Sequence, residues 1–231
     1  MICIFARPDP DNVRFAERTF DVDAQQVQQL ASCYPLPAQL QRAVLKRQAA
    51  FLAGRVCARS ALTALTGSQP DIIPIQPDRA PAWPPGIVGA ITHTTGYAAA
   101  LVGLEHHYQG IGIDCETLMS PDNLNLQRHI CVAHELEGLQ HAHQQWPPET
   151  LLTLIFSAKE SLFKCLYRQV GKFFGFSAAR VVALDRGQQT FVIELLQDLT
   201  PALSTGMRWT GSFQSQDRLL MTTILYPQSA S

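Results

Sequence analysis

The sequence lacks several features that would place it in other classes of protein. Its most apolar region, 86–104, is interrupted by the polar run 92–95, so no stretch has the length of a membrane span. The six cysteines are scattered without a CxxC pair, and the N-terminus carries no basic segment typical of a secretion signal. We therefore expect reduced thiols in a cytoplasmic protein.

Common nucleotide and hydrolase motifs are also missing. There is no GxGxxG, Walker A or GxSxG sequence, which disfavours dinucleotide binding, P-loop ATP hydrolysis and α/β-hydrolase chemistry. The formal net charge of −1 gives no electrostatic reason to expect nucleic acid or a membrane surface as a partner. With 231 residues, 46% of them hydrophobic, the chain can form one large domain or two small ones.

Acidic residues are absent over a long segment that is rich in cations. No carboxylate occurs between Asp23 and Asp71, although a cationic helix usually carries acids at four-residue spacing. The segment contains Arg42, Lys46, Arg47, Arg55 and Arg59. This pattern indicates either an anion-binding surface or a solvated basic face whose partners lie elsewhere.

The order of the expected elements predicts an α+β fold. A helix followed by strands occurs twice, with a hinge near 105–109, so we expect two halves, 1–107 and 108–231. Each half would pack a long helix on a small, mostly antiparallel sheet. The expected helices are 38–65, 123–143 and 149–168, and the expected strands are 1–6, 87–92, 97–103, 110–116, 178–184, 190–196, 207–214 and 218–226.

Two carboxylates lie in the strand-like run GIGIDCE, 110–116. Side chains alternate along a strand, so Asp114 and Glu116 share a face while Ile113 and Cys115 face the core. Such a pair is stabilised by a cation, and Mg²⁺ commonly takes one or two carboxylates with phosphate oxygens and water. The alternative is an exposed strand end with two solvated acids.

A second set of charges lies in the helical run FSAKESLFK, 156–164. Glu160 and Lys164 are four residues apart and share a helix face, next to Lys159. A surface Glu–Lys pair is one explanation, but the segment is apolar on nearly all sides, which indicates burial.

Two further motifs are compatible with phosphate binding. His93 in ITHTTG follows Thr92 at a strand end, although a single histidine is often structural. Arg47 and Arg55 lie on neighbouring faces of one helix, and arginine suits bidentate phosphate binding. Gly54 is costly in a helix, so we expect close packing there.

Five motifs in this order resemble the Sfp-type 4′-phosphopantetheinyl transferases, and most closely the branch that contains the enterobactin synthetase component D. They are FLAGR at 51–55, RAPAWP at 79–84, ITHTTG at 91–96, GIGIDCE at 110–116 and FSAKESLFK at 156–164. The chain departs from the family pattern at Thr92, which replaces Ser, and at Phe156, where many members have Trp.

The resemblance implies a role for each matching residue. The metal ligands would be Asp114, Glu116 and Glu160. The residues that bind coenzyme A would be Arg47, Arg55, Arg79, Thr92, His93, Lys159 and Lys164. Asp114, Glu160 and Lys164 would be catalytic, with Glu160 as the candidate base. The resemblance also implies two pseudo-symmetric halves with the active site in the cleft between them.

The implied reaction moves phosphopantetheine from coenzyme A to a serine of an acyl, peptidyl or aryl carrier protein. Adenosine 3′,5′-bisphosphate would leave, and Mg²⁺, with Mn²⁺ as the alternative, would assist. We expect a monomer that serves siderophore or other nonribosomal peptide or polyketide synthesis. The carrier would dock around Arg168, Lys172, Phe173 and Phe174, opposite the segment 122–131. The alternatives are another Mg-dependent phosphotransferase and a non-catalytic protein that binds coenzyme A or carrier proteins.

Overall fold

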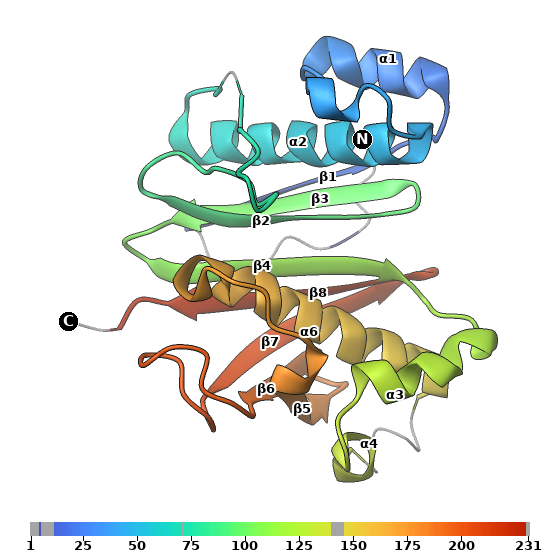
Figure 1. Cartoon of the computed structure of the whole chain (residues 1–231), viewed down its shortest axis with the longest axis vertical. Helices are drawn as coiled ribbons and strands as arrows, with labels where there is room; N and C mark the ends of the chain where they lie inside the picture. Colours follow the sequence, from blue (N-terminus) through green and yellow to red (C-terminus); the bar gives the residue numbers. More distant parts are fainter. Residues whose placement is uncertain (1–4, 6–11, 71, 140–145, 230–231) are drawn as a thin grey trace. The chain divides into compact units, whose positions relative to one another are not determined.

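Two compact α+β units make up the chain. The structure is a computed structural model that describes residues 5, 12–70, 72–139 and 146–229. One unit is Met1–Gln109 together with Pro227–Ser231, and the other is Gly110–Tyr226. Each has a long helix against an antiparallel sheet (Figure 1), which confirms the expected α+β class.

The first unit is a three-stranded sheet covered by helices. The strands lie in the order β1-β3-β2, and α2 packs on one face with α1 on its outer side (Figure 1). A Cβ at Gly54 of α2 would lie 2.8 Å from Ile91 Cγ2, so the expected close packing at this glycine is confirmed. The bounds are β1 Val13–Thr19, α1 Ala24–Cys33, α2 Leu45–Thr66, β2 Ile87–Thr94 and β3 Tyr97–Leu104.

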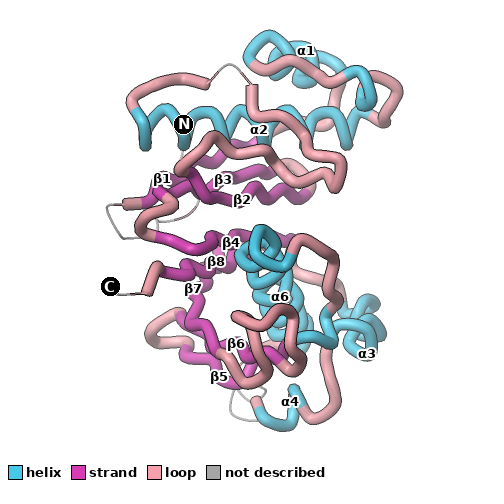
Figure 2. Tube along the Cα trace, turned by 60° about the vertical axis from the view of Figure 1, so that its left-hand side comes forward, coloured by secondary structure: helices cyan, strands magenta, loops and turns pink. Residues whose placement is uncertain are grey.

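The second unit is a five-stranded sheet on which α6 packs. The strand order is β4-β8-β7-β6-β5, and short helical turns follow β4 and precede β5 (Figure 2). Its core joins apolar residues of α6 to those of the sheet, such as Leu154, Leu162 and Ile193. The bounds are β4 Tyr108–Thr117, η2 Pro121–Leu126, α3 Gln127–Ile130, α4 Glu135–Gly138, α6 Pro148–Val170, η3 Phe176–Ala178, β5 Ala179–Asp185, β6 Thr190–Leu195, β7 Arg208–Gln216 and β8 Leu219–Pro227.

The helix expected over 38–65 starts later than predicted. A single 3₁₀ turn, η1 Ala38–Leu40, is followed by turn residues, and α2 begins only at Leu45. The reason is local: Val44 is extended, and the Gln48 amide lies 2.9–3.1 Å from the carbonyl oxygens of Leu40, Gln41 and Ala43. These carbonyls are therefore bonded to a side chain instead of to the next helical turn.

The helix expected over 123–143 is wrong as a continuous element. The described part consists of η2, α3 and α4, and residues 140–143 lie outside the described residues. Cys131 is extended, and His134 has a left-handed backbone with φ of 61°. The Glu135 carboxylate accepts the Val132 N–H at 2.9 Å, which stabilises this break.

The other long helix and the seven strands from 87 onward are confirmed. Pro148 starts α6 and the left-handed Gly171 ends it, with the Gly171 N–H donated to the Tyr167 carbonyl. Neither β1 nor α1 was predicted from the sequence. The strand expected at 1–6 lies outside the described residues except for Phe5. Within the described ranges, none of the helices is both long enough and apolar enough to cross a membrane.

Candidate functional site

Two glycines bring β4 unusually close to α6. A Cβ at Gly112 would lie 1.9 Å from the Ser161 carbonyl oxygen, and one at Gly110 would lie 2.0 Å from that of Cys165. Any larger residue would force the strand away from the helix. Because side chains alternate along a strand, the face that carries these glycines continues with Asp114 and Glu116. The motif therefore places its carboxylates beside α6.

Lys164 of α6 binds directly to the β4 motif. Its ammonium donates to Asp114 Oδ1 at 2.7 Å and to the Ile113 carbonyl at 3.1 Å. The Asp114 side chain is 5% exposed and that of Lys164 is 23% exposed. An ammonium has three N–H donors, so the residues that the structure describes leave one of them for a further acceptor.

The three carboxylates of the site influence one another. Burial, and then the charge of Asp114, raises the pKa of Glu116 to about 7. Burial also raises the pKa of Glu160, with Asp114 adding to the effect and Lys164 opposing it. A carboxylate whose charge is disfavoured in this way is stabilised by an added cation.

The donor set fits a divalent cation that binds together with a phosphate-bearing substrate. Among the residues that the structure describes, no group of three His, Cys, Asp or Glu side chains could hold a metal ion alone. Mg²⁺, however, prefers hard oxygen ligands and commonly combines one or two carboxylates with water and phosphate oxygens. Such oxygens are present on Asp114, which is buried, and on Glu116 and Glu160, which are half-buried.

Lys159 faces away from that site and is almost completely buried. Its ammonium donates to Glu135 at 2.7 Å, to the Ile130 carbonyl at 2.8 Å and to the Phe176 carbonyl at 3.2 Å. These three contacts use all three of its N–H donors. In this arrangement none is left for the phosphate contact that the family resemblance implies.

The sequence reading did not identify Glu135 as part of this cluster. One oxygen of the Glu135 carboxylate accepts hydrogen bonds from the Lys159 ammonium and the Val132 N–H. The other oxygen accepts the Val181 N–H at 2.7 Å. The pair thus ties the α3–α4 segment to α6 and β5. Glu135 and Glu137 lie on either side of Leu136, and nothing in the sequence distinguishes the buried carboxylate from the exposed one.

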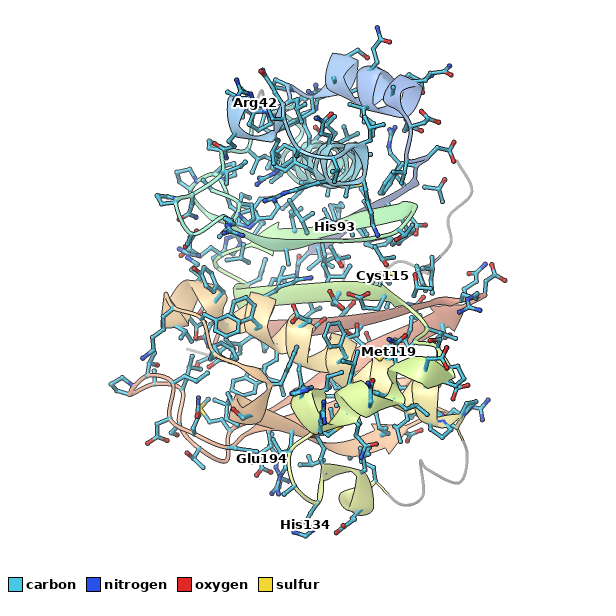
Figure 3. The ribbon with its side chains drawn as sticks, turned by 45° about the vertical axis from the view of Figure 1, so that its right-hand side comes forward. Arg42, His93, Cys115, Met119, His134 and Glu194 are labelled. Atoms are coloured by element: carbon cyan, nitrogen blue, oxygen red, sulfur yellow. The ribbon has the colours of Figure 1, made fainter. Side chains whose placement is uncertain are left out.

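The expected coenzyme A residues of the first unit are of two kinds. Arg47, Arg79 and His93 are exposed, on α2, on the loop after it and near the end of β2, where Figure 3 labels His93. Arg55 and Thr92 are buried. Arg55 donates to the Ile73 carbonyl at 2.9 Å and lies over the Phe51 ring, and burial lowers its pKa.

Comparison with known proteins supports one family for both units. Residues 36–103 match the family model described as the 4′-phosphopantetheinyl transferase N-terminal domain. Residues 110–214 match the model of the 4′-phosphopantetheinyl transferase superfamily. The chain belongs to this superfamily. The two matches include every residue of the candidate site, from Arg47 to Lys164.

Named relatives of this transferase cover most of its length. The chain is 32% identical over 197 residues to 4′-phosphopantetheinyl transferase Npt of Nocardia iowensis, covering 80% of this chain and 85% of that protein. It is 37% identical to Svp of Streptomyces mobaraensis, with 69% and 63% covered. Enterobactin synthase component D of Salmonella typhimurium is 37% identical over 147 residues, with 63% and 58% covered.

Proposed function

We propose that this chain transfers 4′-phosphopantetheine from coenzyme A to a serine hydroxyl of a carrier protein and releases adenosine 3′,5′-bisphosphate. The observation that carries the proposal is the cluster of Asp114, Glu116, Glu160 and Lys164, held together by the close approach of β4 to α6. Phosphoryl transfer requires mainly positioning and charge neutralisation, which this cluster supplies. Membership of the transferase family agrees with this chemistry.

Each charged residue of the cluster has a distinct task in the proposed reaction. Asp114, Glu116 and Glu160 would hold Mg²⁺, which when bound neutralises charge on the pyrophosphate oxygens. The remaining N–H of Lys164 would donate to a phosphate oxygen, while Asp114 keeps the ammonium in place. Glu160 is also the candidate base for the serine hydroxyl.

Residues of the first unit would bind parts of coenzyme A that do not react. Arg47, Arg79 and His93 are exposed and can donate to phosphate groups. Interactions of equal strength in the ground and transition states affect KM more than kcat. We propose siderophore, nonribosomal peptide or polyketide carriers as the substrate class. That the enzyme works as a monomer in the cytoplasm stays a prediction.

The test is mass spectrometry of an apo-carrier protein incubated with coenzyme A, Mg²⁺ and this chain. We expect the carrier to gain one phosphopantetheine group, and we expect the gain to disappear when EDTA replaces Mg²⁺.

Asp114→Ala should lose at least about 100-fold in rate, because a ligand oxygen and the anchor of Lys164 are removed together. Glu137→Ala, which removes an exposed carboxylate of the same unit, is the matched control and should transfer normally. Transfer by Asp114→Ala at the wild-type rate would contradict the proposed site.

A further inference from the structure

The loop that carries Arg79 is a short, hydrogen-bonded hairpin. The Gln76 N–H donates to the Ala80 carbonyl at 2.9 Å, the Arg79 N–H to the Gln76 carbonyl at 2.8 Å, and the Ala82 N–H to the Pro74 carbonyl at 2.9 Å. Arg79 at the tip has a left-handed backbone with φ of 74°. That conformation is uncommon for a residue with a side chain and persists where its surroundings determine it.

The foot of this hairpin is held by a buried tyrosine. The Tyr34 hydroxyl accepts the Ile73 N–H and donates to the Ile73 carbonyl, each at 2.8 Å. Tyr34 is 2% exposed and Ile73 is 1% exposed, so water cannot replace these bonds. Arg55 donates to the same carbonyl at 2.9 Å.

The rings around this contact leave the hydroxyl little freedom to move. Tyr34 packs edge-on against Phe51, with ring centroids 6.3 Å apart. The Arg55 guanidinium lies over the Phe51 ring, 5.2 Å from its centroid. Tyr34 directly follows α1 and lies before residue 36, where the family match begins. A segment outside the matched region therefore fixes the start of the Arg79 hairpin.

We infer that Tyr34 is a positioning residue for coenzyme A binding. Through both polar groups of the Ile73 backbone, it sets the path of the hairpin that presents the Arg79 guanidinium to a phosphate group of the cofactor. This inference rests on the proposed function, which assigns Arg79 to coenzyme A. The contact between Arg79 and coenzyme A then depends on the Tyr34 hydroxyl, which does not itself touch coenzyme A.

A double-mutant cycle tests this coupling. The variants are Tyr34→Phe, Arg79→Gln and the double variant, each measured by calorimetry for the Kd of coenzyme A with Mg²⁺ and by steady-state kinetics for kcat. Tyr34→Phe should weaken binding about fivefold with kcat changed less than about twofold, and Arg79→Gln should weaken it about tenfold. The double variant should bind no more than about twofold worse than Arg79→Gln, because the hydroxyl acts through the guanidinium.

Tyr97→Phe is the matched control for general loosening of the unit. It also removes a buried tyrosine hydroxyl, one that donates to Glu17 Oε2 at 2.7 Å on β1. It should lower the melting temperature as Tyr34→Phe does, yet leave the Kd of coenzyme A unchanged. Amide exchange of residues 76–82 should become faster in Tyr34→Phe and not in Tyr97→Phe.

The outcomes separate this inference from the proposed function. Effects of Tyr34→Phe and Arg79→Gln that multiply in the double variant would overturn the inference, as would equal weakening by Tyr97→Phe or an unchanged Kd in Tyr34→Phe. An unchanged Kd in Arg79→Gln would overturn it too, by removing the contact that the hydroxyl is inferred to support. Failure of the wild-type chain to modify any carrier would instead contradict the proposed function, and the Kd cycle would still decide the role of Tyr34.

Discussion

At the scale of single residues, two lysines that lie five residues apart on α6 have different surroundings. Lys159 meets one carboxylate and two carbonyls in the protein interior, whereas Lys164 meets one carboxylate and one carbonyl at a half-exposed position. Acceptors among the described residues occupy all three N–H groups of the Lys159 ammonium but only two of those of Lys164. We therefore expect a structural role for Lys159 and a ligand-binding role for Lys164.

Replacing Lys159 should reveal that structural role. We expect Lys159→Met to lower the free energy of unfolding by about 3–5 kcal/mol, because the buried Glu135 would lose its charge partner. Arg208→Met is the control: it breaks an ion pair with Glu194 at an arginine that is 61% exposed, and should cost less than about 1 kcal/mol. Urea denaturation measures both values.

Coenzyme A affinity completes the comparison. The folded fraction of Lys159→Met should bind coenzyme A with the wild-type Kd in calorimetry. A weakened Kd combined with unchanged stability would show that this ammonium reaches a phosphate, as the family resemblance implies.

At the scale of elements, the approach of β4 to α6 depends on the missing side chains of two glycines. We predict that Gly112→Ala lowers the free energy of unfolding by about 2 kcal/mol or more, because the added methyl group would meet the Ser161 carbonyl. Carrier modification should fall as well, since the strand and helix that supply the carboxylates would separate. Gly138→Ala in α4, where the added methyl group meets no atom within 4 Å, should leave stability and activity nearly unchanged.

Elements defined by periodicity could be predicted from the sequence, and elements defined by side-chain contacts could not. The alternation in 190–195 and the helical pattern of 148–170 are local and gave correct assignments. The late start of α2 depends on the Gln48 amide, and the break at 131–134 depends on Glu135. Both bonds involve groups whose meeting cannot be deduced from residue spacing.

The candidate site shows the same division. Asp114 and Glu116 share a strand face, and Glu160 and Lys164 a helix face, so each pair could be predicted separately from its spacing. That the two faces meet follows only from the Gly112–Ser161 approach in the folded unit. The sequence predicted coenzyme A binding for both Arg55 and Arg79. In the structure Arg55 is buried and donates to a backbone carbonyl, whereas Arg79 is exposed.

At the scale of the whole molecule, the expected carrier surface includes an exposed aromatic ring. Phe173 is 79% exposed, and its ring lies 5.6 Å from that of Phe163 on α6. Arg168 and Lys172, which precede it, are exposed cations. An apolar anchor beside positive charge suits an acidic helix of a carrier protein.

Phe173→Ser should therefore raise the KM for the carrier protein about fivefold while leaving the Kd of coenzyme A unchanged. The wild-type kcat/KM for the carrier should also fall as salt increases, because charge attraction mainly accelerates encounter. Val22→Ser, which changes an exposed apolar residue of the first unit, should alter neither value. A carrier KM that is insensitive to both Phe173→Ser and salt would place the docking surface elsewhere.

The direct backbone contact between β4 and α6 also governs how the site moves. Because no side chain separates Gly112 from Ser161, the strand and the helix pack backbone to backbone, and we expect them to move together. The carboxylates of the two elements should then keep nearly fixed positions relative to one another. A cation that binds to these carboxylates would need to restrict little motion of β4 relative to α6. Little of its binding free energy would then be lost to ordering the protein.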